Sequence, residues 1–233
     1  MTLPVIHRVR TLDLAFKPWR WPFADERRAE IAAHFAAKQR EKPIWNGRIL
    51  LGRNPKFTAE RFSASYFDAD FASFLAWRDW GFPDRDVFNG FGMGALRCAD
   101  GVFLLGEMGQ HTSNAGRVYF PSGTPDLDDI SGGGAVDIAG SVAREVEEET
   151  GLNAADYRAG AHWYCVVSGA AIAIIRILDV GVTGEALRAR VEANLAGQSQ
   201  PELSAIHLVH EKGDLTAAMP RFVIAFLEAQ MIA

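Results

Sequence analysis

Three glutamates are spaced so that an α-helix would bring their carboxylates together on one face. Glu145, Glu148 and Glu149 stand at positions i, i+3 and i+4, which are neighbours on about one helical turn. Carboxylates this close repel one another, and a bound divalent cation removes that repulsion. Mg²⁺ suits such a cluster, because it binds a few carboxylate oxygens and keeps water and phosphate oxygens in its octahedral shell. The spacing therefore predicts a metal site on a helix.

The residues around the glutamates predict how this helix is anchored. Val142 and Val146 would lie on its other face and pack on a core. Asp137 is the expected N-cap before Ile138, and Gly151 suits the left-handed conformation that ends a helix. The alternative is a solvated, glutamate-rich helix, which is the usual meaning of a run of charges. The longer pattern of residues 144–152 favours the metal site.

Residues 144–152 read R-E-V-E-E-E-T-G-L, which resembles the core of the Nudix box, R-E-U-x-E-E-x-G-U, where U is apolar. In the Nudix hydrolase superfamily the full box, G-x5-E-x7-R-E-U-x-E-E-x-G-U, forms a loop, a helix and a loop. Residues 120–129, F-P-S-G-T-P-D-L-D-D, resemble the opening of that box. In this alignment Gly123 is the box glycine, and Asp129 takes the place of the first glutamate.

The left half of the box is longer here than in the family pattern. Fourteen residues separate Asp129 from Arg144, where the pattern has seven. The surplus includes Ser131-Gly132-Gly133-Gly134, which is typical of turns. We therefore expect residues 130–137 to form a surface loop near the mouth of the substrate site and to leave the catalytic helix intact.

The resemblance implies roles for the matching residues. Metal ligands would be the side chains of Glu145, Glu148 and Glu149 and the backbone carbonyl of Gly123, with Arg144 orienting a box glutamate. The metal would be Mg²⁺, with Mn²⁺ as an alternative. The general base stays open between Glu145 and Glu202, since some family members use a glutamate from a late loop. Glu202 is equally well explained as a solvent-facing loop residue.

Residues just before the box are further candidates for the site. Residues 117–120 are predicted to be the strand that delivers the box, and we expect Arg117 and Phe120 to contact the substrate. His111, Trp163 and Tyr164 are candidates for contacts with a base or a sugar. A buried position in a strand is the stronger expectation for Trp163.

The resemblance implies an enzyme that hydrolyses a nucleoside diphosphate linked to another moiety. The products would be a nucleoside monophosphate and a phosphorylated compound. The N-terminal section, the Gly-rich stretch 92–96 and the long box resemble the UDP-glucose diphosphatase branch, which implies a nucleotide sugar as substrate. The alternatives are a coenzyme A or ADP-ribose diphosphatase and a non-catalytic Nudix module that senses a ligand. The three intact glutamates favour an enzyme.

The fold implied by the resemblance is α/β: a Nudix α/β/α sandwich with a mixed sheet, in residues 88–233. Residues 1–87 have a different character and are expected to form an N-terminal α/β extension. Periodicity and turn residues indicate the individual elements. We predict helices at 25–38, from 68, at 184–196 and from 220, strands at 44–51, 157–168, 170–179 and 206–209, and a hairpin of 93–98 with 102–107.

Composition excludes several classes of protein. The chain has 233 residues, 48% hydrophobic and 23% charged, and a net charge of −5. An acidic chain is a poor nucleic-acid binder, because such proteins neutralise phosphates with clustered Lys and Arg. A membrane span is not expected, since no run of about eighteen apolar residues occurs. Cys98 and Cys165 are expected to be free thiols of a cytoplasmic protein. Its partner would be a small molecule; the oligomeric state stays open, with a homodimer as one alternative.

Overall fold

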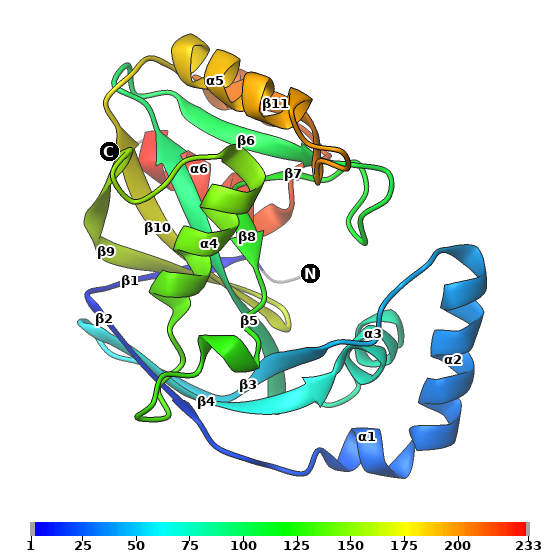
Figure 1. Cartoon of the computed structure of the whole chain (residues 1–233). Helices are drawn as coiled ribbons and strands as arrows, with labels where there is room; N and C mark the ends of the chain where they lie inside the picture. Colours follow the sequence, from blue (N-terminus) through cyan, green and yellow to red (C-terminus); the bar gives the residue numbers. More distant parts are fainter. Residues whose placement is uncertain (1–2, 232–233) are drawn as a thin grey trace.

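A computed structural model describes residues 3–231 as a mixed α/β fold (Figure 1). Most of the expected elements are present, and several others occur in the first 70 residues. In chain order, the elements are β1 (Val5–Val9), β2 (Thr11–Phe16), α1 (Pro22–Glu26), α2 (Arg28–Glu41), β3 (Arg48–Phe57), β4 (Arg61–Asp70), α3 (Phe71–Asp79), β5 (Val87–Arg97), β6 (Phe103–Met108), β7 (Val118–Tyr119), β8 (Ser122–Gly123), η1 (Leu127–Asp129), α4 (Ile138–Thr150), β9 (Tyr157–Ser168), β10 (Ala171–Val180), α5 (Gly184–Ala196), β11 (Leu203–Val209), η2 (Lys212–Asp214) and α6 (Arg221–Met231).

The strands within residues 3–231 join into one curled, mixed sheet. Its main path runs β1-β9-β10-β5-β3-β4-β2. A second branch leaves β5 through β6, which pairs with β7 and β11, and β8 also pairs with β5. β10 lies parallel to β5 and β2 lies parallel to β4, whereas the other pairs are antiparallel. The predicted mixed sheet is therefore confirmed.

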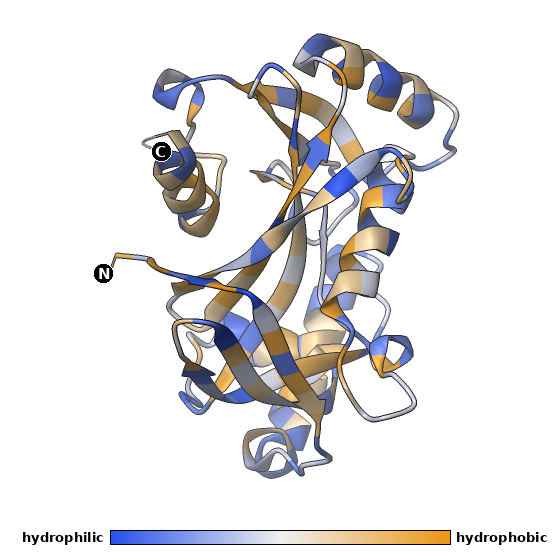
Figure 2. Ribbon diagram, turned by 90° about the vertical axis from the view of Figure 1, so that its left-hand side faces the viewer, coloured by the Kyte–Doolittle hydropathy of each residue, from blue (hydrophilic) through white to orange (hydrophobic). Residues whose placement is uncertain are grey.

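Helices α4 and α6 cover opposite faces of the strands β5, β9 and β10, as the two views agree (Figures 1 and 2). The close approach of α4 requires glycine in β5. A Cβ atom at Gly92 would lie 2.6 Å from Val142 Cγ2, and one at Gly94 would lie 2.6 Å from Val146 Cγ2. On the other face, Phe226 of α6 is fully buried. This layering is the expected α/β/α arrangement.

The N-terminal section has a hydrophobic core of its own and also shares the main sheet. The rings of Trp21, Phe67 and Trp77 pack against one another beneath α1, α2 and α3. However, β1 pairs with β9 and β3 pairs with β5, so strands of this section continue the sheet of the rest of the chain. The boundary at residue 87 stays a prediction.

The surplus residues of the long box form a small hairpin docked on β2. Asp137 N donates to Asp129 O at 2.8 Å, so the two ends of the insertion meet. Ile130 and Val136 form a bridge, and Val136 N donates to Leu14 O of β2 at 2.8 Å. A loop that leaves and returns at one point adds length without displacing α4. The expected position near the substrate mouth is not supported, because this hairpin packs on β2 and none of residues 130–137 lines the large cleft of the molecule.

Several local predictions are confirmed at the level of single residues. The Asp137 side chain accepts a hydrogen bond from Gly140 N at 2.9 Å, so it is the N-cap of α4. Gly151 ends that helix in the left-handed conformation, with φ of 73°. Cys98 and Cys165 are free and buried.

Within residues 3–231, no helix is both long and apolar enough to cross a membrane.

Candidate active site

Two of the three box glutamates turn inward from α4 toward β8. Glu149 is only 4% exposed, and its Oε1 accepts a hydrogen bond from Ser122 N at 3.3 Å. Glu145 lies directly against Gly123, where any Cβ atom would collide with the carboxylate. A larger residue at position 123 would therefore displace the Glu145 carboxylate. Glu148 is exposed at the edge of the same face.

The inward carboxyls have raised pKa values. Burial, followed by the charge of Glu148, raises the pKa of Glu145 to about 7. Burial also raises the pKa of Glu149 well above its usual range, against the opposing effect of the Ser122 hydrogen bond. The Glu202 carboxylate contributes to both increases, so this exposed residue faces the same cluster from the start of β11. Glu145, Glu149 and Glu202 therefore form one electrostatic group.

Arg144 pairs with Asp129. Its Nη1 and Nη2 atoms contact the two Asp129 carboxylate oxygens at 2.7 and 3.1 Å. Asp129 is 4% exposed and also accepts a hydrogen bond from Asp126 N at 3.0 Å. The pKa of Arg144 is raised by this pairing. Both carboxylate oxygens of Asp129 are therefore bound. The pair ties residues 126–129 to helix α4, and Arg144 orients Asp129, which stands where the box has its first glutamate.

The acidic group fits a divalent cation by its chemistry, although the side chains do not form a closed cage. Within residues 3–231, no three His, Cys, Asp or Glu side chains stand in an arrangement that would hold a metal ion as they are. The raised pKa values of Glu145 and Glu149 arise from burial and mutual repulsion, which a cation relieves. Glu148 and Glu202 are exposed beside these two carboxyls.

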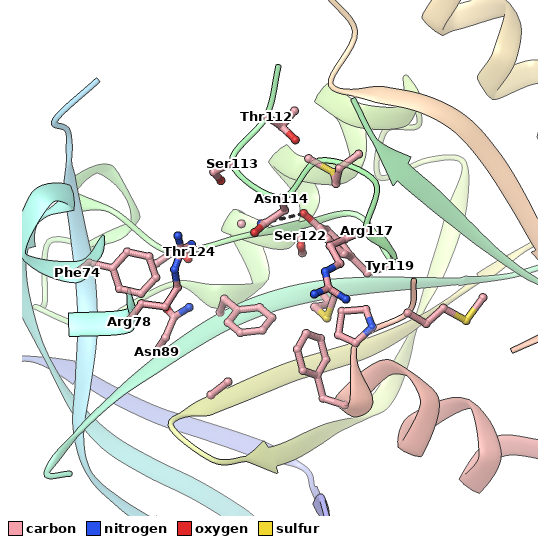
Figure 3. A pocket seen from close by; sticks show the side chains of 18 of the residues that line it. Phe74, Arg78, Asn89, Thr112, Ser113, Asn114, Arg117, Tyr119, Ser122 and Thr124 are labelled. Carbon is pink, nitrogen blue, oxygen red and sulfur yellow. Dashed lines mark hydrogen bonds between the residues drawn. The ribbon is translucent and has the colours of Figure 1, made fainter. Parts of the chain in front are cut away.

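A large cleft of about 830 Å³ adjoins the acidic group. Ser122, Gly123 and Glu202 line one part of it, and Phe74 and Arg78 of α3 line another. The remaining walls come from β5, β7, the loop between β6 and β7, and the start of α6. Figure 3 shows Phe74 and Arg78 on one side of the cleft and Tyr119 on the other.

The structure brings Arg117 into the cleft but not Phe120. Arg117 and Tyr119 line the cleft, and Asn114 Nδ2 donates to the Tyr119 hydroxyl at 3.1 Å (Figure 3). Phe120 is fully buried, with its ring centroid 5.6 Å from that of Phe226. Successive side chains of an extended chain point to opposite sides, so residues 117 and 119 face the cleft and residue 120 faces the core. Phe120 is therefore a core residue, and the expected substrate contact is not supported.

Of the other aromatic candidates, one lines the cleft and two pack in the interior. His111 lines the cleft. Trp163 is 6% exposed within β9, as its strand position predicted, and the Tyr164 ring packs against Phe226 with centroids 5.4 Å apart. Sequence reasoning missed the wall supplied by α3 and the following turn. The sequence predicts the helix from residue 68, but no local signal shows that one of its faces lines a cleft together with distant residues such as Arg117 and Glu202.

The chain matches no protein-family model and no curated protein. Among solved structures, it is similar to the MutT protein from Methanosarcina mazei Go1, with a TM-score of 0.39, 20% identity, and coverage of 61% of this chain and 92% of that chain. For RenU, a Nudix hydrolase from M. smegmatis, the TM-score is 0.40 at 14% identity, covering 63% and 88%. For a Nudix hydrolase from Nitrosomonas europaea, it is 0.33 at 16% identity, covering 62% and 78%. Similarity at this level bears on neither family membership nor activity.

Proposed function

We propose that this chain is a Nudix-type, metal-dependent diphosphatase that hydrolyses a nucleoside diphosphate linked to another moiety. One observation carries the proposal. The half-buried carboxyl of Glu145 lies against Gly123, the buried carboxyl of Glu149 accepts a hydrogen bond from Ser122 N at the wall of a large cleft, and Glu202 faces them from another element. The motif that predicts this chemistry in the sequence is thus also a cluster in space.

The residues of the box would hold Mg²⁺ or Mn²⁺ through the Glu145, Glu148 and Glu149 carboxylates and the Gly123 carbonyl. When bound, the ion supplies neutralisation of phosphate oxygen charge and acidifies the attacking water. Arg117 lines the cleft, and no ion pair within residues 3–231 engages its guanidinium. It is therefore free to bind phosphate oxygens, which is the ordinary use of an arginine in a phosphate site.

Proton transfer falls to Glu145 or Glu202. The pKa of Glu145 is about 7 in the metal-free protein, and a bound cation would lower it, so that Glu145 would be ionised near neutral pH and able to accept a proton from water. Glu202 is exposed at the edge of the cleft, so a proton taken up there passes readily to solvent. Substitution distinguishes the two: loss of the base lowers kcat and changes the pH profile, whereas loss of a metal ligand alone is offset in part by higher Mg²⁺.

The substrate class that we propose is a nucleotide sugar. The cleft volume is in the range that holds a ligand of nucleotide size. Coenzyme A and ADP-ribose are the alternatives. The Gly-rich strand that resembles the UDP-glucose branch has a packing role here, since Gly92 and Gly94 admit α4. Support for that branch therefore comes from the N-terminal section and the long box.

A ligand-sensing module is a second candidate, and one observation favours it. The side chains of the acidic group are not arranged as a closed metal cage within residues 3–231. A sensor would bind its ligand in the cleft without turnover. The intact Glu145, Glu148 and Glu149 set favours the enzyme, because a sensor has no need of three mutually repelling carboxylates.

A panel of UDP-glucose, ADP-ribose and coenzyme A with Mg²⁺ tests the function. We expect UDP-glucose or a related nucleotide sugar to yield a nucleoside monophosphate and a sugar phosphate, and a folded Glu145→Gln variant to be inactive. A kcat/KM at least about tenfold higher for another compound, or about 1.4 kcal/mol of transition-state stabilisation, would replace the nucleotide sugar as substrate. Binding without hydrolysis of any compound would identify a sensor.

A further inference from the structure

The end of the cleft formed by the N-terminal section is built from aromatic rings and a few polar groups. Phe74, Phe82 and Phe91 line it from α3, from the turn after α3 and from β5. Asn89 and Arg78 add an amide and a guanidinium to the same walls. Figure 3 shows Phe74, Arg78 and Asn89 gathered on one side of the cleft. This composition differs from that of the acidic group at Gly123.

The Phe82 ring is held at the cleft by an unusual backbone. Phe82 has a φ of 60°, a left-handed conformation that is costly for a residue with a bulky side chain. Phe82 N donates to Trp77 O at 2.8 Å and Gly81 N donates to Arg78 O at 3.1 Å, which is the Schellman pattern that ends a helix. The ring stands edge-on to Trp77, with centroids 4.7 Å apart. Strain of this kind is typical of functional positions.

Asn89 has an unsatisfied polar atom. Its Oδ1 is buried and has no hydrogen-bond partner within residues 3–231, while its backbone N–H donates to Ala170 O at 2.8 Å. A buried polar atom without a partner costs stability, so such atoms require an explanation. Rotation of the amide by half a turn exchanges its oxygen and nitrogen, so Asn89 offers the cleft either an acceptor or a donor.

We propose that this end of the cleft binds the heterocyclic base of the nucleotide, with the Phe82 and Phe91 rings against its faces and Asn89 and Arg78 at its polar edge. A base has two apolar faces and carries its hydrogen-bonding groups in the plane of the ring, which matches aromatic walls with a few polar groups. A sugar carries hydroxyls around its whole rim and would need more partners. The Arg78 guanidinium keeps terminal nitrogens for this edge, because its contact with Asp79 uses Nε, at 3.2 Å. The assignment rests on the proposed function.

Binding of neutral nucleosides to the full-length, metal-free protein tests the proposal. Adenosine, guanosine, uridine and cytidine lack the phosphates that would involve the acidic group, and ribose lacks the base. Ligand-observed NMR at millimolar concentration should show saturable binding of at least one nucleoside and none of ribose. Binding of no nucleoside, or of ribose equally well, would overturn the proposal. Nucleoside binding without hydrolysis of any nucleotide would instead leave the base site standing and remove the diphosphatase.

Two variants separate recognition from folding. Asn89→Leu keeps the branched shape of the side chain and removes the unpaired amide, so we expect at least tenfold weaker nucleoside binding with an unchanged or higher melting temperature. Phe82→Gly removes the ring and relieves the left-handed backbone, and should also weaken binding at least tenfold. Asn194→Leu is the matched control, because its Nδ2 is also buried without a partner but lies on α5, outside the cleft lining. Unchanged affinity in Asn89→Leu, or an equal loss in Asn194→Leu, would contradict the assignment.

Discussion

At the scale of single residues, the burial of the inward carboxyls of α4 lowers the free energy of unfolding, and we expect it to serve catalysis. Glu149 is 4% exposed, and a buried ionised carboxylate is costly unless it is paired. We predict that Glu149→Gln lowers kcat by orders of magnitude and leaves the free energy of unfolding at neutral pH unchanged or higher. Steady-state kinetics and urea denaturation measure the two effects.

Glu147 provides a control on the same helix. Its side chain is exposed, and it occupies a variable position of the box. Glu147→Gln removes the same charge from the same turn and should leave both kcat and stability close to wild type. If Glu149→Gln kept normal turnover in a folded protein, or if Glu147→Gln lost it equally, the inward face of α4 would not be the site.

The same carboxyls predict how stability depends on pH. The pKa of Glu145 rises from 4.5 to about 7 in the folded state, so between these values the folded protein binds more protons than the unfolded chain. The free energy of unfolding should therefore fall as pH rises from 4.5 to 7, and the Glu145 contribution should level off above that. Thermal melts in EDTA across pH 4.5 to 8 measure this.

Mg²⁺ supplies the corresponding control for the pH dependence. A cation bound by the ionised carboxylates should restore the melting temperature at pH 8 and have little effect at pH 5, where Glu145 and Glu149 are protonated in the folded protein. Glu149→Gln should flatten the metal-free profile. A profile that rises through this window, with no response to Mg²⁺, would show that these carboxyls are not coupled to a cation.

At the scale of elements, the structure explains how α4 keeps its place although the segment before it is long. The insertion closes on itself, since Ile130 and Val136 pair and Asp137 N bonds Asp129 O. The tip of the insertion contacts β2, where Phe16 N donates to Gly134 O at 2.8 Å. No residue from 130 to 137 lines the cleft.

The insertion therefore makes a specific prediction. Replacing residues 131–135 with Asn-Gly would close the Ile130–Val136 pair with a two-residue turn and remove the hydrogen bond from Phe16 N to Gly134 O, while Val136 N keeps its bond to Leu14 O of β2. We expect KM and kcat to stay close to wild type, and the free energy of unfolding to fall by about 1 kcal/mol for the lost hydrogen bond. A large change in KM in a stable variant would place the insertion in the substrate site instead.

Local signals predicted the elements that carry the box, and long-range pairing decided those that the sequence missed. Helix α4 is specified by signals within its own residues: the N-cap Asp137, the terminating Gly151 and the helical spacing of its apolar residues. The strand β2 carries no such local signal, because it forms by pairing in parallel with β4, about 50 residues later in the chain. The helix expected at 25–38 is interrupted at Arg27, where α1 ends and α2 begins. The cleft was also beyond sequence reasoning, since its walls come from distant elements.

At the scale of the whole molecule, the N-terminal section and the rest of the chain enclose the cleft together. The loop between β6 and β7 lines the cleft with His111 and Asn114, and the end of α2 holds this loop. Lys42 Nζ donates to Gln110 O at 3.0 Å and also to Thr112 O. An ammonium that binds two carbonyls of one loop connects the N-terminal section directly to the cleft wall.

This connection predicts an effect on binding that is separable from the fold. Lys42→Met keeps most of the unbranched side chain and removes its donors, so the loop should open more often while the cores stay packed. We expect faster amide exchange in residues 109–116, a higher KM at similar kcat, and a free energy of unfolding within about 0.5 kcal/mol of wild type, since the site is at the surface. Lys38→Met, on the same helix, removes ion pairs to Glu41 and Asp79 without touching the loop, and should leave exchange and KM unchanged. Equal exchange and KM in Lys42→Met and wild type would show that the loop holds its position over the cleft without α2.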